Sequence, residues 1–163
     1  GDGWLHTGDL GDLTDGFLRI TGRKKSLFKL SNGKYIAPEP IENGLKASRF
    51  VQEAVVIGES RKVAGVIIAP AFDALEAFAA DEGLSVGSRE ELVESPDVRK
   101  LYRAEVDGLT GHLADFERLR VLLLMPREFS IEAGELTPTL KVKRGKVLGA
   151  LAEQIEEAYA GTT

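Results

Sequence analysis

The chain has 163 residues, of which 43% are hydrophobic and 29% are charged, and its formal net charge is −5 at pH 7. These proportions are those of an ordinary soluble globular protein, and the negative charge argues against nucleic-acid binding, which requires cations to neutralise phosphates. The absence of cysteine excludes disulfides and thiolate metal sites, and two distant histidines argue against zinc. No run of about 18 apolar residues predicts a transmembrane helix, so we expect a cytoplasmic location, with peripheral membrane contact left open.

The first predicted element is a β-hairpin over residues 4–23, which read WLHTGDLGDLTDGFLRITGR. Asp15-Gly16 is a two-residue turn signal that favours positive φ, and residues 17–20 alternate as a half-buried strand does. The chain begins directly on this dense motif. We therefore expect it to be a piece of a longer protein.

The register of this hairpin brings a carboxylate and a guanidinium together. If the turn has two residues, Asp9 lies opposite Gly22 and within side-chain reach of Arg23. A carboxylate accepts two hydrogen bonds and suits the diol of a ribose, whereas a guanidinium donates in a planar fork. The alternative is an ordinary surface ion pair, which contributes about 0–1 kcal/mol.

Strands and helices alternate through the rest of the chain. We expect strands at 27–30, 34–36, 54–58, 63–68 and 121–125, and helices at 39–47, at 72–81, from 88, from 96 to about 118 and at 144–158. The apolar runs 54–58 and 63–68 predict an antiparallel core pair. The class is therefore α+β: a short, mostly antiparallel sheet flanked by helices and preceded by a hairpin.

A second short hairpin is predicted around the turn Ser31-Asn32-Gly33. Gly33 supplies a left-handed conformation, and Lys29 and Lys34 flank the turn. Such a turn allows a ligand to approach the backbone closely. Taken alone, it is equally an ordinary tight turn with solvated lysines.

Four cations fall within six residues where the last helix is expected to begin: Lys141, Lys143, Arg144 and Lys146. The helix dipole disfavours positive charge at this end, by roughly 0.3–1 kcal/mol per charge. A placement that local electrostatics opposes indicates cations that serve a ligand. A basic solvated face is the alternative.

Four motifs together carry a family resemblance: GWLHTGD, DGFLRITGRKK, NGKYIAPEPIE and GELTPTLKVKR. The chain resembles the C-terminal portion of AMP-forming acyl-CoA synthetases, in the adenylate-forming superfamily. The last two motifs are most similar to those of the long-chain fatty acid branch. That branch typically has Thr-Pro-Thr-Leu-Lys where short-chain relatives have a Pro-Lys-Thr…Gly-Lys pattern. The resemblance covers nearly the whole chain.

The resemblance implies roles for five residues. Asp9 matches the aspartate that binds the ribose hydroxyls of ATP and of the acyl-adenylate, and Arg23 matches the arginine that supports this contact. Lys25 falls at the hinge between a large N-terminal domain and a small C-terminal lid. Lys29 and Gly33 fall on a hairpin that borders the pantetheine channel during the second half-reaction.

The resemblance also implies a catalytic lysine that contacts the carboxylate and the α-phosphate. Aligning Leu136 with the leucine of the short-chain pattern selects Lys143, whereas an alignment on Gly-Lys selects Lys146. We predict Lys143, because the Thr-Pro-Thr-Leu anchor is longer.

The implied activity is a long-chain fatty acid–CoA ligase that uses ATP, Mg²⁺ and CoA. Residues 1–24 would be the last hairpin of the large adenylation domain and residues 25–163 the lid. The Mg²⁺ ligands, the phosphate loop and the acyl pocket would lie in that other domain, so we expect the chain alone to be inactive. The alternatives are a fatty acyl-AMP ligase that loads a carrier protein and a stand-alone, non-catalytic binding module.

Overall fold

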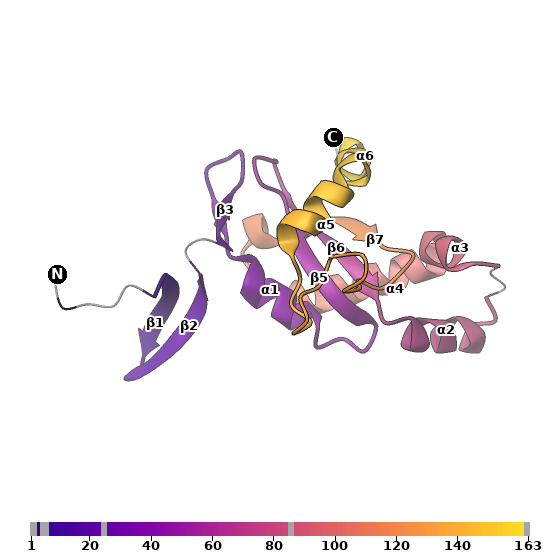
Figure 1. Cartoon of the computed structure of the whole chain (residues 1–163), viewed down its shortest axis with the longest axis horizontal. Helices are drawn as coiled ribbons and strands as arrows, with labels where there is room; N and C mark the ends of the chain where they lie inside the picture. Colours follow the sequence, from indigo (N-terminus) through magenta and orange to yellow (C-terminus); the bar gives the residue numbers. More distant parts are fainter. Residues whose placement is uncertain (1–2, 4–6, 24–25, 85–86, 162–163) are drawn as a thin grey trace.

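The computed structural model describes residues 3, 7–23, 26–84 and 87–161 (Figure 1). The strands are β1 (Asp9–Thr14), β2 (Phe17–Arg23), β3 (Phe28–Lys29), β4 (Tyr35–Ile36), β5 (Val51–Ile57), β6 (Ala64–Pro70) and β7 (Leu119–Leu124). The helices are α1 (Pro38–Leu45), α2 (Phe72–Asp81), α3 (Arg89–Glu94), α4 (Pro96–Thr110), α5 (Arg144–Ala150) and α6 (Ala152–Ala160), with a 3₁₀ turn, η2, at Asp115–Glu117. None of the helices in these described ranges is long and apolar enough to cross a membrane.

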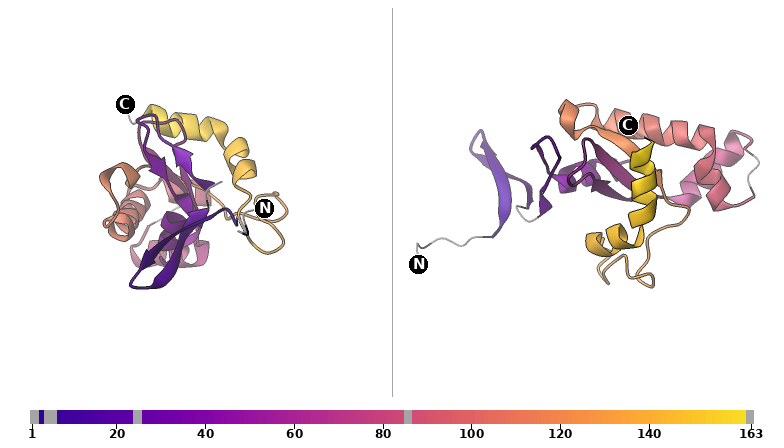
Figure 2. Two further views of the ribbon diagram at one scale, coloured as in Figure 1. Left: turned by 90° about the vertical axis from the view of Figure 1, so that its left-hand side faces the viewer. Right: turned by 90° about the horizontal axis from the view of Figure 1, so that it is seen from above.

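The centre of the fold is a three-stranded sheet in the order β5-β6-β7. The β5–β6 pair is antiparallel, as expected, and the β6–β7 pair is parallel. Side chains alternate along β5: Val56 packs into a core with α1 to α4, and Val55 packs into a second core with α5 and α6. Helices therefore cover both faces of the sheet (Figure 2), and the α+β class is confirmed.

Two helix predictions are wrong in extent. The α4 helix ends at Thr110, not near 118, because Gly111 follows it and the chain turns into the separately capped η2. The last helix is two helices, since Leu151 leaves helical geometry at φ −108° and ψ 18°. Leu151 is buried in the second core, and two glycines in α5 lower the helix propensity there.

The first hairpin stands apart from the sheet, at the N-terminal end in Figure 1. Its turn has the predicted geometry, with φ +52° at Asp15 and +83° at Gly16. The predicted register holds from Thr14 back to Gly11, where a bulge shifts the pairing by one residue. Asp9 consequently lies opposite Arg23 and not Gly22, which corrects the predicted pairing.

A tightly packed glycine on β6 provides a test of the sheet. An added Cβ at Gly65 would lie 2.7 Å from Val121 Cβ and 3.0 Å from the Tyr159 hydroxyl. We expect Gly65→Ala to lower the free energy of unfolding by about 1–3 kcal/mol in urea titrations. Gly149→Ala is the control, since nothing lies within 4 Å of its Cβ position in α5. Equal effects of the two substitutions would contradict this packing.

Candidate functional site

A groove of about 980 Å³ runs along β5, which is an outer strand of the central sheet. Its walls come from α1 on one side and from α5, α6 and residues 140–142 on the other. Charged side chains of both signs line it: Glu39, Glu42, Lys46, Glu53, Glu59, Arg61, Lys141, Arg144 and Glu156. The groove therefore presents charged groups from α1, β5 and the segment around α5 to one concave surface, which makes it the candidate binding site.

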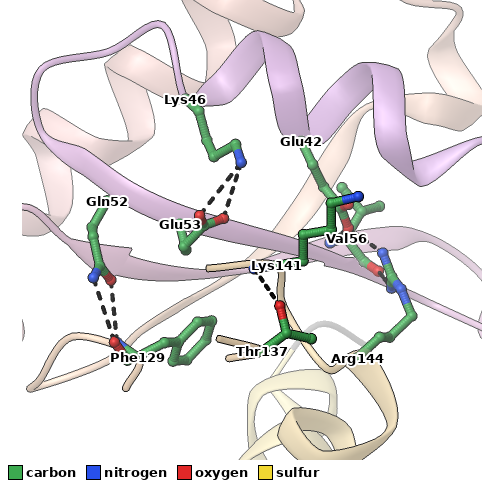
Figure 3. A network of polar contacts seen from close by, with 9 residues as sticks. All are labelled: Glu42, Lys46, Gln52, Glu53, Val56, Phe129, Thr137, Lys141 and Arg144. Atoms are coloured by element: carbon green, nitrogen blue, oxygen red, sulfur yellow. Dashed lines mark hydrogen bonds and ion pairs between the residues drawn. The ribbon is translucent and has the colours of Figure 1, made fainter. Parts of the chain in front are cut away.

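The segment before α5 forms a small closed loop. Leu136 and Val142 form an antiparallel bridge, and the Leu140 N–H donates to the Thr137 carbonyl at 2.8 Å. The Lys141 N–H donates to Thr137 Oγ1 at 3.0 Å (Figure 3). Leu140 has φ +59°, a left-handed conformation that favours glycine. Leu140 is 63% exposed, and both Leu140 and Lys141 line the groove.

The N-terminal end of α5 is attached to the opposite wall by Arg144. Its Nη1 donates to the Val56 carbonyl at 2.6 Å, and its Nη2 donates to Glu42 Oε1 (Figure 3). Glu42 Oε1 also accepts the Val56 N–H at 2.8 Å. Burial raises the pKa of the Glu42 carboxyl, while the Arg144 charge and the Val56 N–H act in the lowering direction. One of the four clustered cations is therefore paired within the fold.

The other end of this loop (residues 136–143, the lysine loop) is attached through Glu135. Its carboxylate accepts two hydrogen bonds from Arg127, each 2.7 Å long, and one from the Ser130 N–H. The Glu135 carbonyl accepts the Lys143 N–H at 2.6 Å. The paired Arg127 guanidinium lowers the pKa of the Glu135 carboxyl, although burial acts in the raising direction.

The Lys29 hairpin is a separate two-stranded element, β3–β4, and the Lys29 carbonyl accepts the Ser60 N–H at 2.8 Å. Gly33 has φ +87° and its N–H donates to the Leu30 carbonyl at 3.0 Å, so the predicted left-handed turn is confirmed. The Lys29 ammonium lies 5.8 Å from the centre of the Tyr35 ring. Neither Lys29 nor Gly33 lines the groove.

The predicted ribose and hinge residues are less fully described. Asp9 is exposed on β1, and its N–H donates to Thr7 Oγ1 at 3.2 Å. The side chain of Arg23 and the whole of Lys25 lie outside the described part of the chain, so their predicted roles stay predictions. In the described ranges, no group of three or more His, Cys, Asp or Glu residues could hold a metal. We assign none of these residues to Mg²⁺.

Comparison with known protein families identifies the domain. A model described as "AMP-binding enzyme C-terminal domain" matches residues 25–163. The chain belongs to this family. Two solved adenylation domains of carboxylate reductases share the fold of this AMP-binding C-terminal domain. The one from Mycobacterium chelonae has a TM-score of 0.75 and 26% identity, and the match covers 94% of this chain and 23% of that one. The one from Segniliparus rugosus, solved with AMP and a co-purified carboxylic acid, has a TM-score of 0.77, 23% identity and coverage of 96% and 23%.

Full-length relatives of this C-terminal domain are fatty acid–activating enzymes by name. It is 43% identical to the peroxisomal long chain acyl-CoA synthetase 7 of Arabidopsis thaliana, over 98% of this chain and 23% of the relative. It is 44% identical to the long-chain-fatty-acid–CoA ligase 5 of Rattus norvegicus, over 97% and 24%. The chain thus spans about a quarter of the length of these relatives.

Within this AMP-binding domain, the structure singles out a lysine that the sequence interpretation missed. All three lysines are exposed, but of the three only Lys141 lines the groove; Lys143 directly precedes α5 and Lys146 lies within it. In the short-chain pattern a glycine directly precedes the lysine, and glycine adopts a positive φ more readily than other residues do. Leu140 has such a positive φ directly before Lys141. The sequence alignment still predicts Lys143 as the catalytic lysine, and the structure adds Lys141 as a second candidate.

The Glu135 attachment predicts a pH-dependent stability difference. Because its pKa is lowered from 4.5 on folding, the ionised carboxylate stabilises the fold above about pH 4.5, and this contribution is lost as the pH falls through the folded-state pKa. Glu135→Gln should lower the free energy of unfolding by about 1–2 kcal/mol at pH 7, since solvent screens the half-exposed Arg127. The gap from wild type should shrink toward pH 3 in urea titrations. The exposed neighbour Glu128→Gln should give no such trend; a gap for Glu135→Gln that is constant with pH would contradict the ion pair.

Proposed function

We propose that this chain is the mobile C-terminal lid of a long-chain fatty acid–CoA ligase that consumes ATP and CoA. The identity of 43–44% to two such enzymes across nearly the whole chain carries this proposal. Asp9 and Arg23 would hold the ribose of ATP at the edge of the nucleotide site. Mg²⁺ would be held by residues outside this chain, and the cytoplasm is the proposed location.

The proposed reaction has two steps. A carboxylate oxygen of the fatty acid attacks the α-phosphorus of ATP, so that a new P–O bond forms and the bond to pyrophosphate breaks. The sulfur of CoA then attacks the acyl carbon, a C–S bond forms, and AMP leaves. Negative charge builds on the α-phosphate oxygens in the first step, so a lysine delivered by the lid stabilises that transition state.

Two lysines compete for this first-step role. The sequence alignment favours Lys143, and the loop geometry favours Lys141, which lines the groove after the left-handed Leu140. In the described part of the chain, neither lysine forms an ion pair, so either ammonium is available to a phosphate. We assign the role to Lys141 and treat Lys143 as the alternative.

The positions of Lys29 and Lys141 support a lid that changes orientation between the steps. Lys29 lies on β3 and Lys141 on the lysine loop, and of the two only Lys141 lines the groove, which favours a separate role for each lysine. Rotation about Lys25 would withdraw the lysine loop after adenylation and present the Lys29 hairpin to the pantetheine of CoA. Lid motion that completes a site in turn is a general device of enzymes.

The first hairpin supports a division at residue 24. Large apolar side chains remain exposed on it: Leu13, Phe17, Leu18 and Ile20. An exposed apolar patch of this kind marks a surface that another part of the protein covers. We propose that residues 1–24 complete the large adenylation domain and that residues 25–163 form the lid.

Thioester formation by the full-length protein tests this function. We expect ATP-dependent ligation of a long-chain fatty acid to CoA, with release of AMP and pyrophosphate. The 163-residue chain alone should catalyse no ATP–pyrophosphate exchange. Adenylate formation that requires a carrier protein, with CoA inactive, would identify a fatty acyl-AMP ligase instead. Absence of adenylate formation by the full-length protein would favour a binding module.

A further inference from the structure

We infer that Arg144 is a positioning residue, which holds the lysine loop (residues 136–143) in place for adenylation through its contacts with Glu42 and Val56. This inference rests on the proposed function. The contacts form a closed ring: Arg144 donates to the Val56 carbonyl and to Glu42, and Glu42 accepts the Val56 N–H. Figure 3 shows the ring across the groove, with Lys141 extending from the loop toward the same wall.

The ring joins three elements that are distant in the chain. Glu42 lies on α1, Val56 on the outer strand β5, and Arg144 is the first residue of α5, 102 residues after Glu42. The two backbone groups of Val56 that receive these contacts belong to an edge strand, where they would otherwise face solvent or another strand. Arg144 therefore attaches the start of α5 to the edge of the central sheet and to α1.

The lysine loop is held at both ends by the same kind of contact. Glu135 with Arg127 holds the residue before the loop, and Glu42 with Arg144 holds the residue after it. Both carboxylates are largely buried, at 3% and 16% side-chain exposure. Such pairs are stronger and more specific in geometry than exposed ion pairs, because less water competes for them.

The position of Lys141 depends on these contacts, because Lys141 lies only three residues before Arg144. Within the loop, short-range hydrogen bonds keep the local shape, such as Lys141 N–H to Thr137 Oγ1. They do not fix the loop relative to α1; Leu136 and Val142 pack in the second core with Val55 of β5, and Arg144 provides the polar contacts to both β5 and α1. Loss of Arg144 should therefore leave the loop folded but poorly positioned, and a misplacement of about 1 Å can cost about 10²-fold in rate.

The test compares Arg144→Met, Arg144→Lys and the matched control Arg103→Met in the full-length protein. Arg103 pairs with Asp107 on α4 and has 34% side-chain exposure, close to the 31% of Arg144, but it lies outside the groove lining. Three quantities are measured for each variant: kcat and KM for ATP–pyrophosphate exchange, the rate of thioester formation from supplied acyl-adenylate, and the thermal midpoint.

For Arg144→Met we expect kcat for exchange to fall roughly 10- to 10²-fold, with KM for ATP and the thioester step within about twofold of wild type. Arg144→Lys should recover part of kcat, because it keeps one of the two contacts. Arg103→Met should change neither half-reaction. Equal loss of both half-reactions together with a lower thermal midpoint would overturn the positioning role, as would a wild-type kcat.

Hydrogen exchange separates this inference from the proposed function. In Arg144→Met, amide exchange in residues 136–143 should rise while exchange in β6 stays unchanged. An unchanged exchange rate in the loop would refute the inference even in an active enzyme. Absence of ATP–pyrophosphate exchange in wild type would instead refute the proposed function, and the amide exchange would still decide whether Arg144 holds the loop.

Discussion

Replacing Lys141 by alanine in the full-length protein is expected to slow acyl-adenylate formation by about 10²–10³-fold. This is the usual effect of removing one preorganised group that stabilises transition-state charge. Thioester formation from supplied acyl-adenylate should remain within about twofold of wild type, because the lysine loop has left the reacting atoms by that step. The measurements are ATP–pyrophosphate exchange for the first step and CoA thioester release for the second.

Lys143→Ala and Lys146→Ala are the matched controls, since both side chains are exposed within the same cationic stretch. Each should change the exchange rate by less than about tenfold, the size of a screened charge effect near the site. A loss confined to Lys143→Ala would return the catalytic role to Lys143, as the alignment on Leu136 predicts. A loss confined to Lys146→Ala would support the Gly-Lys alignment on Gly145 instead.

Lys29→Ala is expected to produce the opposite pattern. It should slow thioester formation by about 10-fold or more and leave adenylate formation within about twofold, because this hairpin acts only after the lid has turned. Supplied acyl-adenylate and CoA provide the direct measurement of the second step.

Lys34→Ala on the same hairpin is the control for Lys29. The Lys34 ammonium lies 5.6 Å from the centre of the Phe116 ring, on the neighbouring η2, so its removal alters charge without altering the turn. It should change the thioester step less than Lys29→Ala does. Equal losses in both variants would indicate a general charge effect and not a specific role for Lys29.

The parts of the fold with strong local signals were predictable from the sequence. Asp15-Gly16 predicts the hairpin turn, and two short apolar runs, 54–58 and 63–68, predict the β5–β6 pair. Gly11 and Gly22 lie at the bulge that places Asp9 opposite Arg23, and glycine in a strand is a signal of a bulge that a simple count outward from the turn leaves unused. Registers counted outward from a turn are therefore secure only as far as the first irregularity.

The lysine loop shows why the site was harder to predict than the fold. Leucine rarely adopts positive φ, so nothing in the letters Thr-Leu-Lys indicates that Leu140 occupies a glycine-like position. The sequence leaves the four-cation cluster open between a ligand site and a basic solvated face, and one of its members, Arg144, is paired with a glutamate 102 residues away. Contacts of such long range depend on the packing of the whole domain, and a single sequence does not reveal them.

The central claim is that one lid serves both half-reactions with two different segments: the lysine loop acts in adenylation, and the Lys29 hairpin acts in thioester formation. The most direct test is the ratio of the adenylation rate to the thioester-forming rate, measured side by side in Lys141→Ala and Lys29→Ala. We predict that the ratio falls about 10²-fold or more in the first variant and rises about 10-fold in the second. Ratios that stay at the wild-type value in both variants would contradict the account.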